Sequence, residues 1–221
     1  MEQFYPLLKS TPLFAQFDDG ELAHMLDCLR ARPVKYVKEE TVFLRGDKIT
    51  EAGIIVSGDA FSHREDIDGN RKILSQYQPG DIFFEELLFA GKTIAPFSLT
   101  ANAQTNIIYI DCSEIPKFCK LSCKHHSKLI VNLTRMMSEK IIRLDMKMEI
   151  VQKHTIRDKL LTYFTFLAEQ ENSCAFDIPF SRQALSDYIG ASRSAVSREL
   201  WNMKKEGVIN FNNRSFIFNY R

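Results

Sequence analysis

The twenty residues Ser181–Leu200, SRQALSDYIGASRSAVSREL, have a pattern that predicts two short helices joined by a tight turn. Ser181 and Ser192 each precede a predicted helix, where a serine side chain can cap the free backbone N–H groups. Gly190 can take the left-handed conformation that ends a helix. Four apolar residues are spaced to pack the two helices together: Leu185, Ile189, Val196 and Leu200. The segment is therefore typical of a helix-turn-helix.

The second predicted helix leaves a polar face free of large apolar groups, formed by Arg193, Ser194, Ser197 and Arg198. An arginine at a helix N-terminus opposes the helix dipole, so Arg193 indicates an external anion or a base edge as its partner. Arginine can form two hydrogen bonds to guanine O6 and N7, whereas serine tolerates any base. A solvated helix pair with surface arginines is the alternative.

A predicted β-hairpin follows, in which Val208–Phe211 and Ser215–Tyr220 flank the polar tip Asn212-Asn213-Arg214. A hairpin in this place resembles the wing of a winged helix. We expect Arg193 and Arg198 to contact bases and the start of the first helix to contact phosphates. The predicted DNA-contacting residues are Ser181, Arg182, Gln183, Ser192, Arg193, Ser194, Ser197, Arg198 and Arg214.

Charge and composition set the class of protein. The chain has 221 residues, with 45% hydrophobic and 26% charged residues, which is long enough for a hydrophobic core without disulfides. Residues 153–221 carry ten Lys and Arg against seven Asp and Glu, and the remaining residues carry nineteen against twenty-one. The excess of positive charge in the C-terminal part suits a polyanion. We find no signal sequence and no membrane span, and therefore expect a cytoplasmic protein without a membrane partner.

A long helix is predicted from about Cys119 to Gln152, because this stretch has no Pro or Gly and its apolar residues recur at steps of three and four. A helix of this length needs a partner, and a stripe near the 3.5-residue period can pair with a second copy. The predicted dimer interface is Ile130, Leu133, Met137, Ile141, Leu144 and Met148. Packing within its own chain is the alternative. A hinge is expected near Gln152–Thr155, where the pattern changes.

The N-terminal part is predicted to be rich in strands. A helix over about Asp19–Arg30 precedes short apolar runs separated by turns, and Asp68-Gly69 and Pro79-Gly80-Asp81 are turn signals. Many short strands at regular spacing predict an antiparallel barrel or sandwich.

The whole chain resembles the cyclic-AMP receptor protein / fumarate-nitrate regulator (Crp/Fnr) family of bacterial transcription regulators. The resemblance rests on Phe43–Asp47, Ile55–Gly58 and Pro79–Phe83 in the strand-rich part, on the long helix, and on the helix-turn-helix. It implies an α+β fold with an N-terminal antiparallel β-roll, a long dimerisation helix and a C-terminal winged helix-turn-helix. The implied domains are 1–118, 119–152 and 153–221. The implied partners are double-stranded DNA, a second copy of the chain, and RNA polymerase if the protein is an activator.

The resemblance also places an effector pocket in the β-roll, with the residues Phe84, Glu85, Leu87, Leu88, Ile94, Ala95 and Phe97. Family members that bind cyclic nucleotides have a Gly-Glu pair and a later Arg-Ser or Arg-Thr pair. Here Glu85 matches, but Phe84 replaces the glycine and Ile94-Ala95 replaces the arginine pair. A buried phosphate without a cation is strongly disfavoured, which argues against a cyclic nucleotide. A cyclic-nucleotide-gated regulator remains the alternative, the effector is unidentified, and the expected pocket is apolar. These side chains could also be core residues without a ligand.

The cysteines suggest a further alternative. Cys112, Cys119 and Cys123 lie near His125 and His126 in the sequence, so an iron–sulfur, haem or redox sensor is the alternative. The chain lacks the N-terminal cysteine cluster that iron–sulfur members of the family use, and four ligands do not converge. We therefore predict no metal site and treat the thiols as structural.

No catalytic constellation is evident, so we expect a protein that is not an enzyme. A catalytic barrel of the cupin type would need clustered histidines on its strands. His63 is the only histidine in the predicted barrel, and His24 lies in the preceding helix.

Overall fold

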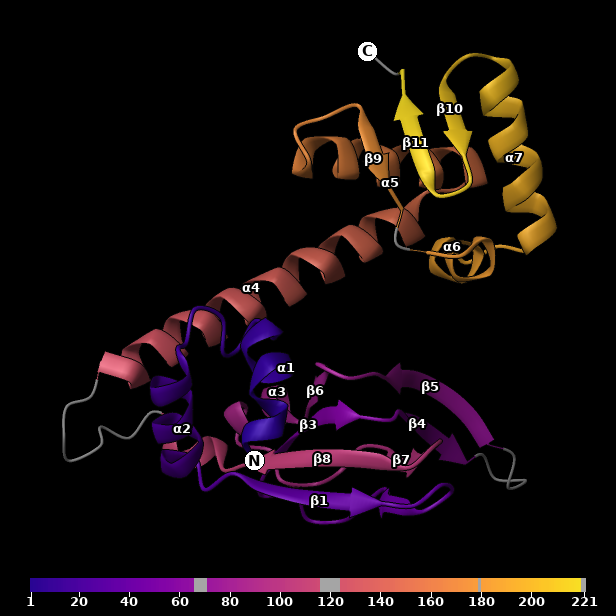
Figure 1. Ribbon diagram of the computed structural model, residues 1–221. Coiled ribbons are helices and arrows are strands. Elements are labelled where there is room, and N and C mark those ends of the chain that lie inside the picture. The colour runs from indigo at the N-terminus through magenta and orange to yellow at the C-terminus, as the bar shows by residue number, and fades with distance from the viewer. Residues whose placement is uncertain (66–70, 116–123, 179, 220–221) are drawn as a thin grey trace. The chain divides into compact units, whose positions relative to one another are not determined.

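The computed structural model in Figure 1 describes residues 1–65, 71–115, 124–178 and 180–219. The chain divides into two compact units, Met1–Met137 and Ser138–Arg221. This division falls inside the long helix, whereas the domain boundaries predicted from the sequence lie at its two ends. The reason is that each half of the helix packs into the core of a different unit.

The first unit is an antiparallel β-roll preceded by short helices, which confirms the predicted fold class. Its helices are η1 (Glu2–Phe4), α1 (Tyr5–Ser10), α2 (Asp19–Cys28), α3 (Glu85–Phe89) and η2 (Cys112–Glu114). Its strands are β1 (Arg32–Tyr36), β2 (Thr41–Phe43), β3 (Ala52–Ser57), β4 (Ala60–Glu65), β5 (Arg71–Tyr77), β6 (Ile82–Phe83), β7 (Ser98–Ala101) and β8 (Thr105–Ile110).

Two antiparallel sheets form the roll, with the strand orders β1-β8-β3-β6 and β2-β7-β4-β5. The β3–β8 ladder pairs Ile54 with Ile108, and both side chains are buried. β4 pairs with β5 as the hairpin signal predicted, although the turn Asp68-Gly69 lies outside the described residues. The helix predicted over about Asp19–Arg30 is α2, which begins with a capping box between Asp18 and Glu21.

The second unit contains the C-terminal part of α4 (Lys124–Gln152) and a winged helix-turn-helix. Its other helices are α5 (Ile156–Gln170), α6 (Arg182–Ile189) and α7 (Arg193–Lys205). Its strands are β9 (Ala175–Asp177), β10 (Ile209–Asn212) and β11 (Ser215–Phe218), which form one antiparallel sheet in the order β10-β11-β9.

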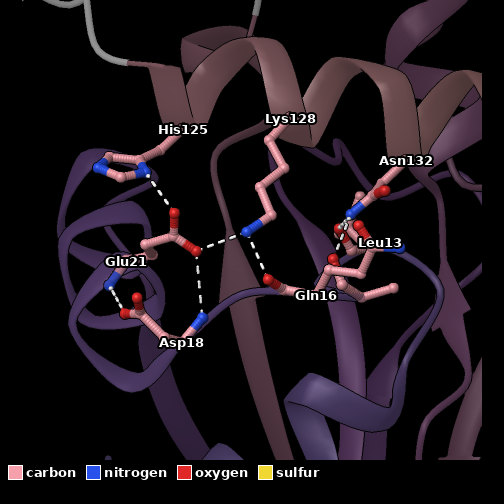
Figure 2. Close-up of polar contacts among 8 residues, drawn as sticks. Leu13, Gln16, Asp18, Glu21, His125, Lys128 and Asn132 are labelled. Carbon is pink, nitrogen blue, oxygen red and sulfur yellow. Dashed lines mark hydrogen bonds and ion pairs between the residues drawn. The ribbon is translucent and has the colours of Figure 1, made fainter.

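The first half of α4 is held by the N-terminal segment of the chain, as Figure 2 shows. Lys128 donates hydrogen bonds to the Gln16 carbonyl and to Glu21, and the Nδ1 of His125 lies 3.3 Å from the same carboxylate. The amide of Asn132 donates to the Leu13 carbonyl at 3.1 Å. The resemblance to the Crp/Fnr family also implies that the segment Phe84–Pro96 lies against this part of the helix, near Ser127–Val131. In the structure, the polar contacts come from the N-terminal segment, and Leu88 of the expected segment borders the same core.

Side chains of α4 that are exposed or half-buried, all apolar except Thr134, form a seam that follows a seven-residue repeat. The seam residues alternate in steps of four and three: Ile130, Thr134, Met137, Ile141, Leu144, Met148 and Val151. Ile141, Leu144, Met148 and Val151 are 56–62% exposed. Leu133, which the sequence analysis includes in the interface, is only 8% exposed and packs in the core of the first unit. Leu133 is therefore not part of the seam.

A break between α4 and α5 occurs where a hinge is expected. α4 ends at Gln152, and the Thr155 hydroxyl caps α5 by accepting a hydrogen bond from the Asp158 N–H at 3.0 Å. However, Ile150 of α4 is fully buried in the same core as Leu160 of α5. The break therefore lies within the second unit and does not separate the two units.

Candidate nucleic-acid interface

Both helices of the helix-turn-helix begin with the serine caps that the sequence predicts. The Ser181 hydroxyl accepts a hydrogen bond from the Ala184 N–H at 3.1 Å, and the Ser192 hydroxyl accepts one from the Ala195 N–H at 3.3 Å. Gly190 ends α6 in the left-handed conformation, with φ of 72°. The two serine hydroxyls thus fix helix starts, where the free N–H groups and the dipole favour an anion.

α6 and α7 pack tightly through the predicted apolar residues. The side chains of Leu185, Ile189, Val196 and Leu200 are all buried. Ser186 is buried at the same contact, and its hydroxyl donates to the Gln183 carbonyl at 2.7 Å, so its polar atom is satisfied within α6. The close packing makes the two helices one rigid element.

Two lysines that the sequence analysis did not identify hold the C-terminal end of α6. Lys147 of α4 donates to the Tyr188 carbonyl and lies 4.2 Å above the Tyr188 ring, while Lys159 of α5 donates to the Ile189 carbonyl at 3.3 Å. Cations stabilise the negative end of a helix dipole. Burial lowers the pKa of Lys147, and the neighbouring positive charge of Lys159 lowers it further. Only the three-dimensional structure brings these lysines to α6.

α7 presents its polar face to solvent, as predicted. Arg193, Ser194 and Arg198 are exposed, and Ser197 is half-buried. Arg157 of α5 forms ion pairs with Glu199 of α7 and with Glu206, the residue that follows α7. These ion pairs compensate the charge of both carboxylates, while Arg193 and Arg198 stay exposed.

Arg182 connects α6 to the wing formed by β10 and β11. Its guanidinium donates to the Asn213 carbonyl at 3.0 Å and stacks on the rings of Phe211 and Phe216, 4.8 and 5.0 Å from their centroids. Burial lowers the pKa of Arg182. The sequence analysis assigns this arginine only to phosphate contact. In the structure it also fixes the wing against α6.

The start of α6, the start of α7 and the wing enclose a cationic hollow of about 350 Å³. Its lining residues are Phe180, Ser181, Arg182, Gln183, Arg193, Asn213 and Arg214. The structure thus brings together five of the predicted DNA-contacting residues, while Ser192, Ser194, Ser197 and Arg198 are not part of this lining. Three guanidinium groups beside a capped helix N-terminus are a suitable site for a phosphate.

The predicted effector pocket lies in the β-roll, and aromatic rings pack in its interior. Phe84 is buried with φ of 72°, a left-handed conformation that a bulky residue rarely takes. Its ring centroid lies 4.5 Å from that of Phe43 and 5.5 Å from that of Phe97, and the Phe83 ring meets it edge-on. The aromatic contacts hold Phe84 in this backbone conformation, where the cyclic-nucleotide binders of the resemblance have glycine.

The other predicted pocket residues do not all line this interior. Glu85 and Ala95 are buried, and Leu87 and Leu88 are half-buried. Ile94 is 57% exposed and forms a backbone bridge with Lys48, so its side chain is not buried among the packed rings. Ile94 is therefore removed from the predicted pocket.

The cysteine hypothesis can be compared with the structure only in part, because Cys119 and Cys123 lie outside the described residues. Cys112 is buried, and burial raises the pKa of its thiol to about 12, so that the thiol stays protonated. His125 interacts with Glu21, and His126 is buried. Within the described part of the chain, no three His, Cys, Asp or Glu side chains are grouped so as to hold a metal ion.

None of the described helices is both long and apolar enough to span a membrane.

Two family models match the chain. The cyclic nucleotide-binding domain model matches residues 33–121, and the Crp-like helix-turn-helix domain model matches residues 158–219. Together they cover well over half of the chain. The first match contains the β-roll strands, and the second contains the helix-turn-helix and the wing.

Relatives and solved structures agree with these matches. The transcriptional activator protein FnrL of Cereibacter sphaeroides is 24% identical over 209 residues, which is 88% of this chain and 78% of that protein. The cAMP-activated global transcriptional regulator Vfr of Pseudomonas aeruginosa is 22% identical over 206 residues, which is 90% of this chain and 92% of that protein.

Among solved structures, DNR from Pseudomonas aeruginosa has a TM-score of 0.53 and 18% identity, covering 100% of this chain and 96% of DNR. The catabolite activator protein of Thermus thermophilus has a TM-score of 0.52 and 19% identity, covering 95% of this chain and 94% of that protein. Together with the β-roll, the long helix and the winged helix-turn-helix described above, these findings show that the chain belongs to the Crp/Fnr family of DNA-binding transcription regulators.

Proposed function

We propose that the protein binds an operator as a homodimer, with α7 reading base edges in the major groove. The observation that carries this proposal is the cationic hollow, in which Arg182, Arg193 and Arg214 meet beside the capped start of α6. A phosphate in this hollow fixes the register of α7, and the exposed Arg198 then reaches a base edge. We also propose that the protein acts in the cytoplasm and that it contacts RNA polymerase if it activates transcription.

The homodimer is proposed from the α4 seam. Its exposed residues repeat every seven positions, which lets two parallel helices pack knobs into holes along a two-fold axis. A two-fold dimer presents two copies of α7 to successive major grooves, about 34 Å apart. No residue of the seam is a base-reading residue, so dimerisation and base reading can be tested separately.

The effector remains unassigned, and we propose that it is not a cyclic nucleotide. The packed rings of Phe43, Phe84 and Phe97 support this proposal, as does the buried Ala95 in place of the family's cationic pair. A cyclic-nucleotide-gated regulator is the second candidate, because residues 33–121 match the cyclic nucleotide-binding domain model and the relative Vfr is described as cAMP-activated.

Arginine substitutions should separate base reading from phosphate binding. Once an operator has been selected from random duplexes with the wild-type protein, Arg198→Ala should cost about 1–3 kcal/mol of binding free energy and relax specificity at one position. Arg214→Ala should weaken binding to all duplexes alike and reduce the salt dependence by about one counterion. Exposed Lys38 of the first unit provides the control Lys38→Ala, measured by fluorescence anisotropy. Normal operator binding by Arg198→Ala would refute the assigned reading face.

A double substitution in the seam should dissociate the dimer. Ile141→Glu with Leu144→Glu places two carboxylates beside their two-fold copies, and light scattering should report the mass of one chain, about 25.6 kDa. Ile142→Glu is the matched control, because Ile142 is also exposed but lies outside the seam. A dimer that survives the double substitution would show that another surface holds the two copies together.

Calorimetry should distinguish the two effector hypotheses. Cyclic AMP and cyclic GMP, each titrated to millimolar concentration, should give no saturable heat, because Ile94-Ala95 stands where the cyclic-nucleotide binders of the family have the arginine pair that binds the cyclic phosphate. A micromolar dissociation constant for either nucleotide would contradict the proposal and favour the gated regulator.

A further inference from the structure

The second unit contains a cavity that the proposed function does not use. It has a volume of about 420 Å³ and lies between α4, α5, Phe180 and the end of α6. Its volume is within the range of small-molecule sites. Among the DNA-contacting residues predicted from the sequence, none lines this cavity.

One wall of the cavity consists of three aromatic rings. The Phe180 and Tyr163 rings are nearly parallel, with centroids 6.2 Å apart, and the Tyr188 ring lies 5.0 Å from Phe180 and 5.2 Å from Tyr163. Tyr163 is buried, and the ammonium group of Lys147 on α4 lies 4.2 Å from the centroid of the Tyr188 ring. The wall is therefore preorganised and offers flat apolar surface to a planar molecule.

On α4, the cavity is lined by the exposed apolar side chain of Ile142, which the proposed dimer does not cover. Ile142 is 52% exposed, whereas Ile150, two turns later, is fully buried in the core of the same unit. The seven-residue repeat places Ile142 outside the seam, so pairing of two copies through the seam leaves it open. A ligand in the cavity would bury this side chain.

Among the described residues that line the cavity, Arg143 is the only cation. Arg143 lines the cavity on α4, as Tyr188 does on α6, and its positive charge opposes the rise that burial causes in the pKa of Tyr188. The structure shows no carboxylate paired with Arg143 among the described residues. Glu139, one turn earlier on α4, also lines the cavity and disfavours a ligand with more than one negative charge. Arginine binds a carboxylate through two parallel hydrogen bonds.

We propose that this cavity binds a planar aromatic monocarboxylate. Its ring system would lie against Phe180 and Tyr188 and cover Ile142, and its carboxylate would bind the guanidinium of Arg143. The site is outside the β-roll, and binding there does not depend on the proposed operator contacts. Because the ligand would bridge α4 and α5 to α6, it would stabilise one position of the rigid element that α6 and α7 form.

The test uses 2-naphthoate as a probe with the full-length protein, measured by calorimetry and by ligand-observed NMR. We expect saturable binding of one 2-naphthoate per chain. Arg143→Gln should weaken it about tenfold, as the loss of a charge-assisted pair implies, and Leu167→Trp, which fills the cavity, should abolish it. Arg135→Gln, an exposed arginine of α4 in the first unit, is the matched control and should bind normally.

Circular dichroism checks that each variant is folded, and the neutral analogue 2-naphthamide separates charge from ring stacking. We expect 2-naphthamide to bind wild-type protein about as weakly as 2-naphthoate binds Arg143→Gln. Absence of saturable binding, or equal affinity of the wild type and Arg143→Gln for 2-naphthoate, would overturn the proposal. Normal binding to a folded Leu167→Trp would place the probe elsewhere and would also overturn it.

Discussion

The exposed apolar seam of α4 is the constraint on which the rest of the structure depends. Ile141, Leu144, Met148 and Val151 are each more than half exposed. Burying apolar surface stabilises a protein by about 25 cal/mol per Å². A single chain in water does not gain the stabilisation that burial of the seam against a second copy would provide. The other apolar side chains of the helix, such as Leu129 and Ile150, are buried in the cores of the two units. One helix therefore provides core to both units and retains a free face for a second copy.

The reading surface depends on polar contacts that position charge. Serine caps fix where α6 and α7 begin, and Lys147 and Lys159 hold the other end of α6. Arg182 serves two purposes, because its stacking on Phe211 and its bond to Asn213 orient the wing while it lines the cationic hollow. Local helix chemistry thus positions the side chains that we propose to contact phosphates.

The parts predicted well from the sequence are those that local chemistry decides. Caps, a glycine helix end and apolar spacing depend on neighbours within a few residues, so the helix-turn-helix was predictable nearly to the residue. Leu133 was misassigned because steps of three and four fit two adjacent faces of one helix, and only the contacts with the first unit distinguish them. Ile94 was misassigned because its exposure depends on how its segment pairs with Lys48, and no short sequence pattern around Ile94 predicts that pairing. The lysines that hold α6 come from other helices, so no short motif identifies them.

Site-specific photo-crosslinking tests the seam most directly. A benzophenone amino acid placed at Leu144 should crosslink two copies of the chain on irradiation, because the seam brings this position to the two-fold axis. The same group at Ile142, two residues earlier and also more than half exposed in one chain, should give no crosslinked pair. Equal crosslinking from both positions, or crosslinking from Ile142 alone, would contradict the proposed pairing of α4.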